Sequence, residues 1–360
     1  LIVDLAIDSA RQAISESNTS PDMIIFANTL SSYSSSQENL STIISEELGL
    51  SDITTFKLES SSCSGAMAVN IGHKLLNSDN LESVLIIGAE KMTDLSPAET
   101  IKATALGESY EYTQFFGITM NSLYALFSRL YMEKYDVTSE ELSQFSVLSH
   151  KHSVTCKHAQ FNREFSLDSI NKSATISSPL RMLNCSPIGD GSASLVLSKT
   201  NNSNFDDVNI LSSTSSNSST SFFSREDLLK FYSTTSCLNK SLAESKIKLE
   251  DIDLLEIHDV VPAITANILE TMGFSKPGNA SSDVLSGRYD LNSKVTLSSS
   301  GGLKARGNPL SATGIYQIIE VTRQLQNRSH ADLENKNIGL CHNMSGIDSN
   351  TVVHVLGVAN

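Results

Sequence analysis

One cysteine at the predicted start of a helix is the residue of this chain best placed to act as a nucleophile. Cys63 follows three serines, Ser60 to Ser62, and precedes residues 64–77, in which apolar side chains recur at helical spacing. Unpaired backbone N–H groups and the positive end of the helix dipole favour a thiolate there, so we expect the pKa of Cys63 to lie below the usual value of about 8.5. The alternative is a small, inert cysteine buried at a strand-to-helix turn.

The composition of the chain argues against several kinds of binding partner and cellular location. Its 360 residues carry a formal net charge of −14, which argues against a nucleic acid or an anionic membrane surface as partner because either would repel the protein. No apolar stretch approaches the roughly 20 residues of a membrane span and no export signal is present, so we expect a cytoplasmic protein. Five cysteines lie far apart without a CxxC pair, which predicts neither disulfides nor a metal site. Leu1 already lies in an amphipathic pattern, so we expect the natural chain to begin further upstream.

Short apolar runs alternate with helical patterns in both halves of the chain. Residues 23–27, 54–58 and 83–88 have the continuous apolar character that is typical of buried parallel strands. Residues 254–257 and 352–356 have the same character. This alternation predicts an α/β layer fold.

Residues 91–187 interrupt the alternation and are predicted to form an insertion. Long insertions on α/β scaffolds commonly carry the walls of a binding site. His150, His152 and His158 lie here, but no acidic or cysteine partner completes a metal-ligand set in the sequence. We interpret the three histidines as polar loop and helix residues and expect no metal.

The second half of the chain repeats the design of the first. Residues 297–325 contain a strand end, a serine run, glycines and a long helical pattern, in the same order as the residues around Cys63. This repetition predicts two halves, 1–200 and 201–360. Their two helix N-termini are expected to face each other across a pseudo-two-fold axis.

Several short motifs, spread in order over nearly the whole chain, resemble those of one enzyme superfamily. They are SSCSGA at 61–66, GAEKMTD at 88–94, FFG at 115–117, CSPIGDGSA at 185–193, HD at 258–259, SGGLKARGNPLSATG at 300–314 and HNMSG at 342–346. The chain resembles the thiolase superfamily, and within it the archaeal acetoacetyl-CoA thiolases and sterol-carrier-protein-2-like thiolases. The resemblance implies two βαβαβαββ halves in a five-layered αβαβα sandwich, with a loop domain inserted at about 91–187, and a homodimer or homotetramer.

The resemblance also implies a reaction. Thiolases form or cleave acetoacetyl-CoA by a Claisen condensation of two acetyl-CoA, with coenzyme A as substrate and without a bound cofactor. Cys63 would carry the acyl group, and His258 would donate a hydrogen bond to the thioester oxygen. Small residues, Ser300, Gly301 and Gly346, would line a site for a short acyl chain.

Two positions depart from the pattern of the superfamily. Asn308 stands where thiolases of this type carry a histidine that activates the cysteine, and asparagine cannot exchange a proton. Related enzymes also carry a second cysteine that removes the α-proton from the substrate. Cys341 is the nearest substitute in this chain.

These departures leave three hypotheses for the function. The first is an acetoacetyl-CoA thiolase. The second is a decarboxylative condensation, because the set Cys63, His258 and Asn308 resembles that of ketoacyl-acyl-carrier-protein synthases of the third type. The third is a catalytically weak or silent subunit that assembles with hydroxymethylglutaryl-CoA synthase and a small OB-fold, zinc-ribbon protein that helps to hold coenzyme A.

Overall fold

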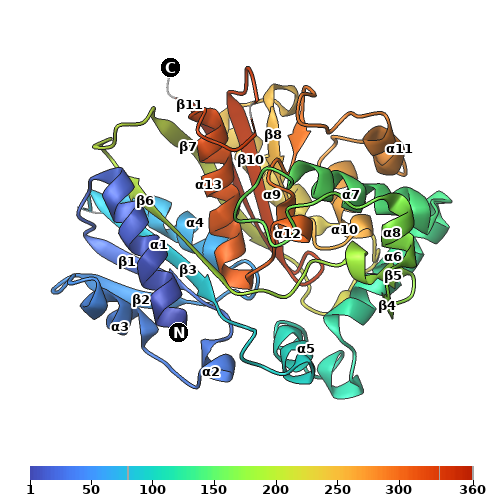
Figure 1. Cartoon of the computed structure of the whole chain (residues 1–360), viewed down its shortest axis with the longest axis horizontal. Coiled ribbons are helices and arrows are strands. Elements are labelled where there is room, and N and C mark those ends of the chain that lie inside the picture. The colour runs from blue at the N-terminus through green and yellow to red at the C-terminus, as the bar shows by residue number, and fades with distance from the viewer. Residues whose placement is uncertain (79–80, 332, 359–360) are drawn as a thin grey trace.

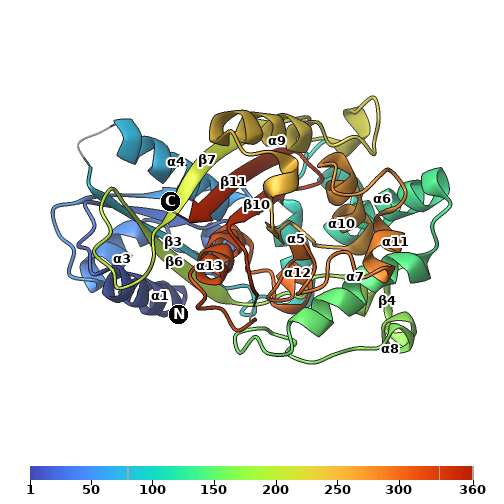
Figure 2. The ribbon, with the colours of Figure 1, turned by 90° about the horizontal axis from the view of Figure 1, so that it is seen from above.

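Two β-sheets form the centre of the protein, with helices between them and on their outer faces (Figures 1 and 2). The computed structural model describes residues 1–78, 81–331 and 333–358. The strand order is β2-β1-β3-β6 in the first sheet and β7-β11-β10-β8-β9 in the second. The strands are β1 (Met23–Ala27), β2 (Thr54–Leu58), β3 (Ser83–Glu90), β6 (Gly191–Ser198), β7 (Val208–Asn217), β8 (Leu254–Glu256), β9 (Thr296–Leu297), β10 (Ile338–Ser345) and β11 (Asn350–Val358).

The two sheets are built alike, which supports a duplicated architecture. The order β6-β3-β1-β2 matches β11-β10-β8-β9, and in both sheets only the β3–β6 or β10–β11 pair of this set is antiparallel. The continuous apolar run of β3 is buried along its whole length, because helices cover both faces of the first sheet. The boundaries 1–200 and 201–360 remain a prediction.

Alternate residues of β1 separate the outer helices from the central ones. Ile24 and Phe26 pack with α1 (Ile2–Ser17) and α3 (Leu40–Glu47), whereas Ile25 and Ala27 face the opposite layer. That central layer consists of α4 (Ser64–Ser78) and α13 (Thr313–Leu325), which contact both sheets.

In the second sheet, adjacent residues of β7 likewise contact helices on opposite faces. Ser213 accepts a hydrogen bond from Asn70 of α4, while Thr214 bonds to Ser241 of α9 (Tyr232–Ser245) on the other face. The helices therefore form three layers around two sheets. The predicted αβαβα sandwich is confirmed.

The two central helices approach each other through glycines near their N-termini. A Cβ on Gly65 would lie 2.1 Å from the backbone oxygen of Ser311, and a Cβ on Gly314 would lie 2.5 Å from the backbone nitrogen of Ala66. Only glycine allows backbones this close. The N-termini of α4 and α13 therefore face each other, as the repeated sequence pattern predicted.

The inserted segment forms a separate helical region beside the sandwich, shown in green in Figure 1. Its α6 and α7 pack on α10 (Pro262–Thr271). Across the residues that the structure describes, no helix is long and apolar enough to cross a membrane. The elements of the insertion are α5 (Pro97–Ala105), η1 (Gln114–Phe116), α6 (Met120–Tyr135), α7 (Ser139–His152), α8 (Leu167–Lys172), the hairpin β4 (Thr175–Ser177) and β5 (Leu180–Arg181), and η2 (Met182–Asn184).

Short helices and turns complete the chain. In the first half, α2 (Ser31–Ser34) follows β1. Those of the second half are η3 (Phe222–Ser224), η4 (Leu249–Asp251), α11 (Ala280–Leu285), α12 (Gly302–Ala305) and η5 (Leu310–Ala312).

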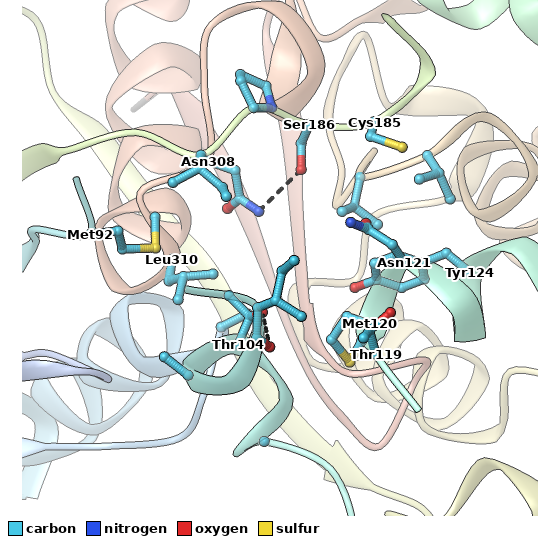
Figure 3. Close-up of a pocket in the computed structure, with 18 of the residues that line it drawn as sticks. Met92, Thr104, Thr119, Met120, Asn121, Tyr124, Cys185, Ser186, Asn308 and Leu310 are labelled. Atoms are coloured by element: carbon cyan, nitrogen blue, oxygen red, sulfur yellow. Dashed lines mark hydrogen bonds between the residues drawn. The ribbon is translucent and has the colours of Figure 1, made fainter. Parts of the chain in front are cut away.

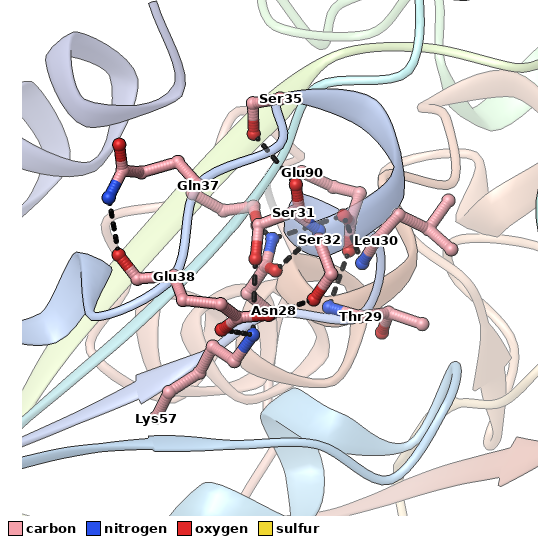
Figure 4. A network of polar contacts seen from close by, with 11 residues as sticks. Asn28, Thr29, Leu30, Ser31, Ser32, Ser35, Gln37, Glu38, Lys57 and Glu90 are labelled. Carbon is pink, nitrogen blue, oxygen red and sulfur yellow. Dashed lines mark hydrogen bonds and ion pairs between the residues drawn. The ribbon is translucent and has the colours of Figure 1, made fainter.

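A buried carboxylate holds three chain segments together where the two halves meet (Figure 4). Glu90, at the end of β3, accepts hydrogen bonds from the backbone N–H groups of Thr29 and Leu30 and from the side chain of Asn28. The hydroxyl of Ser311, from the second half, also donates to Glu90 at 2.8 Å. These bonds fix the loop after β1 against η5, the turn that leads into α13, at the edge of the cavity described next.

Candidate functional site

A cavity of about 730 Å³ lies where the insertion meets both halves of the sandwich. Ser61 and Ser62 reach it from the first half, and His258, Asn308 and Gly346 reach it from the second. In Figure 3, Asn308 and Ser186 lie across the cavity from Asn121 and Tyr124 of α6. Further walls come from apolar side chains of the insertion, among them Met92, Ile101, Met120, Phe161 and Met182.

The turn that leads into α4 decides which side chain faces this cavity. Ser61 adopts a left-handed backbone conformation, with φ of 50°, and its carbonyl accepts a hydrogen bond from the hydroxyl of Thr29. Ser62, which follows, is half-buried and lines the cavity, whereas Cys63 is fully buried and does not line it. The predicted nucleophile thus points into the core, and its neighbour Ser62 takes the position facing the cavity.

The surroundings of the Cys63 thiol oppose ionisation. Its Sγ donates to the backbone oxygen of Asn350 at 3.3 Å, and its backbone N–H donates to the hydroxyl of Ser345 at 3.1 Å. Burial raises the pKa of Cys63 well above its usual value, outweighing a lowering by the Ser345 hydrogen bond. The expectation that the helix N-terminus lowers this pKa is therefore wrong. Within the described residues, no hydrogen bond joins Cys63 to His258 or Asn308.

His258 presents a neutral imidazole to the cavity. Burial lowers the pKa of His258 to about 3. The Nδ1 of His258 lies 3.3 Å from the side-chain nitrogen of Asn343. That nitrogen also donates a hydrogen bond to the side-chain oxygen of Gln317 at 3.1 Å, which fixes the orientation of the Asn343 amide. The amide nitrogen of Gln317 in turn donates to the backbone oxygen of His342. Nδ1 of His258 must therefore accept, and Nε2 carries the proton that can be donated to a ligand.

Asn308 presents its amide N–H₂ to the same cavity. The hydroxyl of Thr313 donates to the side-chain oxygen of Asn308 at 2.8 Å, which leaves the nitrogen on the cavity side. That nitrogen lies 3.5 Å from the hydroxyl of Ser186 (Figure 3). Asn308 can donate hydrogen bonds to a ligand oxygen, but it cannot move a proton.

Asp259, which follows His258, explains why the loop before α12 contains glycine. Asp259 accepts a hydrogen bond from the backbone N–H of Leu303 at the start of α12. A Cβ on Gly302 would lie 2.0 Å from the carboxylate of Asp259, so the loop needs glycine there. His258 thus faces the cavity while Asp259 holds the loop that leads to Asn308.

Only one of the three small residues predicted to bind substrate lines the cavity. Gly346 does so, with a φ of 56°. Ser300 is fully buried and its hydroxyl donates to Glu320, and a Cβ on Gly301 would meet Ser153. The predictions for Ser300 and Gly301 are corrected because their loop packs against the core instead of the cavity.

Cys341, the predicted second base, lies in the middle of the second sheet. On β10 it pairs with His354 of β11 and with Glu256 of β8, and it does not line the cavity. Burial raises the pKa of Cys341 well above its usual value. This placement gives Cys341 no route to a substrate α-proton.

Ser62, Glu108, Tyr124 and Cys185 are among the cavity residues that the sequence did not predict. Ser62 and Cys185 stand inside motifs that were noticed, but the pattern gave no direction for their side chains. Burial raises the pKa of Cys185 to about 11, so its thiol stays protonated. No sequence motif marks Glu108 or Tyr124 as functional; only their position in the insertion places them near a binding site.

A second cluster of chemically active side chains lies outside the cavity. The Nε2 of His158 lies 2.6 Å from the carboxylate of Glu320 and 3.4 Å from the Sγ of Cys156. The interpretation that His158 lacks an acidic or cysteine partner is therefore wrong, because chain folding brings partners from distant positions. The 2.6 Å separation is that of a hydrogen-bonded ion pair, and Arg306 lies 4.0 Å from the same carboxylate.

This ion pair predicts a pH-dependent contribution to stability. Hydrogen bonds to Cys156 and Glu320 raise the pKa of His158 to about 9. Stabilisation by a raised pKa is complete below the unfolded value of about 6.5 and is lost as the pH rises through about 9. His158→Gln should lower the free energy of unfolding by about 1 kcal/mol at pH 6, a value discounted because the imidazole is 43% exposed.

Urea unfolding of both proteins at pH 6 and pH 10 tests this prediction. The difference between wild type and variant should shrink at pH 10. Lys172→Gln, which removes an exposed pair with Asp168, is the matched control and should change stability little at either pH. A difference that is the same at both pH values would contradict the ion pair.

Two family models together cover nearly the whole chain. Residues 2–201 match the thiolase N-terminal domain, and residues 214–358 match the model described as thiolase C-terminal domain-like. The chain belongs to the thiolase family. The acetyl-CoA acetyltransferase of Methanothermobacter thermautotrophicus is 32% identical to this thiolase over 323 residues, which cover 89% of the chain and 84% of the relative. Bovine sterol carrier protein 2 is 27% identical over 86% of the chain and 60% of its own length.

Solved structures share the fold of this thiolase. The Ltp2-ChsH2(DUF35) aldolase matches with a TM-score of 0.85 at 19% identity, covering 99% of this chain and 93% of that one. The acetyl-CoA acetyltransferase of Syntrophomonas wolfei matches with a TM-score of 0.75 at 18% identity and the same coverage. The resemblance to archaeal and sterol-carrier-protein-2-like thiolases is confirmed, and the relatives support thiolase-type acyl transfer as the class of reaction.

Proposed function

We propose that this thiolase forms or cleaves the carbon–carbon bond beside the thioester of a short acyl-CoA, as in acetoacetyl-CoA. The observation that carries the proposal is that two oriented donors, Nε2–H of His258 and Nδ2–H of Asn308, open on one cavity. Chemistry at the α-carbon of a thioester passes through an enolate, whose oxygen is stabilised by such donors. Coenzyme A is the substrate in this proposal, and no bound cofactor is needed.

Complete acyl transfer also needs a group that holds the acyl chain between two half-reactions. For Cys63 to do so, its thiol must leave the carbonyl of Asn350 and turn toward the cavity. The hydroxyl of Ser62 already lies at the cavity, but it is a weaker nucleophile than a thiolate. The arrangement therefore supports enolate formation better than acyl transfer, and we propose a slow enzyme.

A weakly active or silent subunit is the second candidate function. Two observations favour it: Cys63 is walled off from the cavity, and Asn308 cannot serve as a base. In this proposal the protein binds acyl-CoA and assembles with hydroxymethylglutaryl-CoA synthase and an OB-fold, zinc-ribbon protein, or as a homodimer or homotetramer. One solved relative in fold, the Ltp2-ChsH2(DUF35) aldolase, is likewise named for two components.

Three substrates given to the purified protein separate these functions. Coenzyme A-dependent cleavage of acetoacetyl-CoA supports the thiolase proposal, and Asn308→His should accelerate it by supplying a proton carrier. Turnover of malonyl-CoA, but not of acetyl-CoA or acetoacetyl-CoA, would select the decarboxylative alternative built on Cys63, His258 and Asn308. Binding of acetyl-CoA without turnover of any of the three would select the silent subunit.

A further inference from the structure

The cavity holds one carboxyl group whose surroundings match the task of moving a proton. Glu108 lies just after α5, and its side chain is 6% exposed. Within residues 1–78, 81–331 and 333–358, neither of its carboxylate oxygens has a hydrogen-bond partner. These oxygens are not among the fully buried polar atoms that lack a partner, so they are accessible from the cavity, where a ligand can reach them.

Glu108 lies in the corner where the two halves meet the insertion. Its Oε1 lies 2.5 Å from the point where a Cβ on Gly346 would stand, so glycine leaves room for the carboxyl group there. The preceding residue, Gly107, packs on the turn that enters α4, since its Cβ would lie 2.5 Å from the hydroxyl of Ser61. The carboxyl group therefore lies among residues that line the cavity together with His258 and Asn308.

The other titratable groups of the cavity wall do not suit proton transfer near neutral pH. His258 is uncharged and its Nδ1 is occupied by Asn343, while burial raises the pKa values of Cys185 and Tyr124 above their usual ranges. Glu59, also in the wall, is solvent-exposed. Burial raises the pKa of Glu108 to about 7, which places its two protonation states in balance at neutral pH.

The charges near Glu108 moderate this effect of burial. The guanidinium of Arg225 lowers the pKa of Glu108 from the value that burial alone would give. Arg225 itself faces Asp348 and Tyr232 as well as Glu108. Tyr124, from α6, stays uncharged because burial and the Glu108 carboxylate both raise its pKa.

We propose that Glu108 is the base that removes and returns the α-proton of the acyl-CoA in this cavity. The C–H bond breaks, the proton passes to the Glu108 carboxylate, and the electron pair of the bond forms the enolate. The enolate oxygen accepts hydrogen bonds from His258 and Asn308, and the protonated Glu108 returns its proton in the reverse direction. This inference rests on the proposed function, and it supplies the base that Cys341 cannot provide.

Exchange of the α-protons of acetyl-CoA in deuterated water, followed by mass spectrometry, tests the proposal without requiring an acyl carrier. Wild type should exchange these protons, with a rate that rises as the pH passes through about 7, where Glu108 ionises. Glu108→Gln should slow the exchange by about 100-fold or more, in line with typical losses of a general base. Glu108→Asp should recover part of the rate. Glu133→Gln, which removes an exposed carboxylate of α6 outside the cavity, should stay within about twofold of wild type.

Calorimetry of acetyl-CoA binding to the same variants separates the role of Glu108 from the proposed function. Glu108→Gln should still bind, which also shows that the variant is folded. Exchange that persists unchanged in Glu108→Gln would overturn the role of Glu108 alone. Wild type that binds acetyl-CoA and exchanges nothing would overturn both this role and the enolate chemistry of the proposed function. Wild type that fails to bind acetyl-CoA would overturn the proposed function and this inference together.

Discussion

His258→Ala is expected to lower kcat for acetoacetyl-CoA cleavage by about 10²–10³-fold, while acetyl-CoA binding changes by only a few-fold. The variant removes the Nε2–H that is oriented toward the cavity by the contact between Nδ1 and Asn343. A donor of this kind stabilises the enolate more than the bound thioester, so its loss falls on kcat. Steady-state kinetics with acetoacetyl-CoA and coenzyme A measures the effect.

Two further variants test whether the orientation of the His258 imidazole matters as well as its presence. Asn343→Ala leaves His258 in place but removes the contact that fixes its tautomer, and it should lower kcat by a smaller factor than His258→Ala. His330→Ala, outside the cavity, should leave kcat unchanged. An unchanged kcat in His258→Ala would show that this imidazole does not serve the reaction.

Ser62→Cys is expected to create a reactive thiol that wild type lacks. The side chain of Ser62 faces the cavity at the start of α4, whereas that of Cys63 is buried against the carbonyl of Asn350. Intact-protein mass spectrometry after mixing with acetyl-CoA should detect an acetyl group on Ser62→Cys at least about ten times sooner than on wild type, where the Cys63 thiol must first leave the carbonyl of Asn350. Alkylation by iodoacetamide at pH 8 should likewise be at least about ten times faster at the new thiol, because burial and thiolate content govern cysteine reactivity.

Cys63→Ala is the matched control for this experiment. It should retain the α-proton exchange of wild type, and the double variant Ser62→Cys, Cys63→Ala should still acquire the acetyl group. An acetyl group acquired by wild type as fast as by Ser62→Cys, and lost in Cys63→Ala, would contradict this prediction and make Cys63 a fully active acyl carrier. Such a result would mean that the Cys63 side chain turns into the cavity when substrate is bound.

The order of motifs was enough to predict the fold and part of the site. Repeated strand, serine, glycine and helix patterns predicted two similar halves, and the matching strand orders of the two sheets agree with them. The resemblance of their motifs to those of thiolases predicted that His258, Asn308 and Gly346 belong to one site. They do line one cavity.

The direction of individual side chains could not be predicted from the pattern. Whether Ser62 or Cys63 faces the cavity depends on the left-handed conformation of Ser61, a backbone choice that residue types leave open. Ser300 and Cys341 were assigned from their neighbours in sequence, but a buried loop and a central strand hold them elsewhere. Glu108 was missed because its altered pKa arises from burial by segments distant in sequence.

The glycine contact between α4 and α13 limits how this scaffold can diversify. Gly65 and Gly314 bring main chain against main chain, so the separation between the first-half and second-half walls cannot be retuned by repacking rotamers. Any larger residue there would wedge the halves apart and shift Ser62 relative to Asn308. Adaptation to bulkier acyl groups is therefore expected in the insertion, where Ile101 of α5, Met120 of α6 and the loop residue Phe161 can be exchanged without disturbing the duplicated framework.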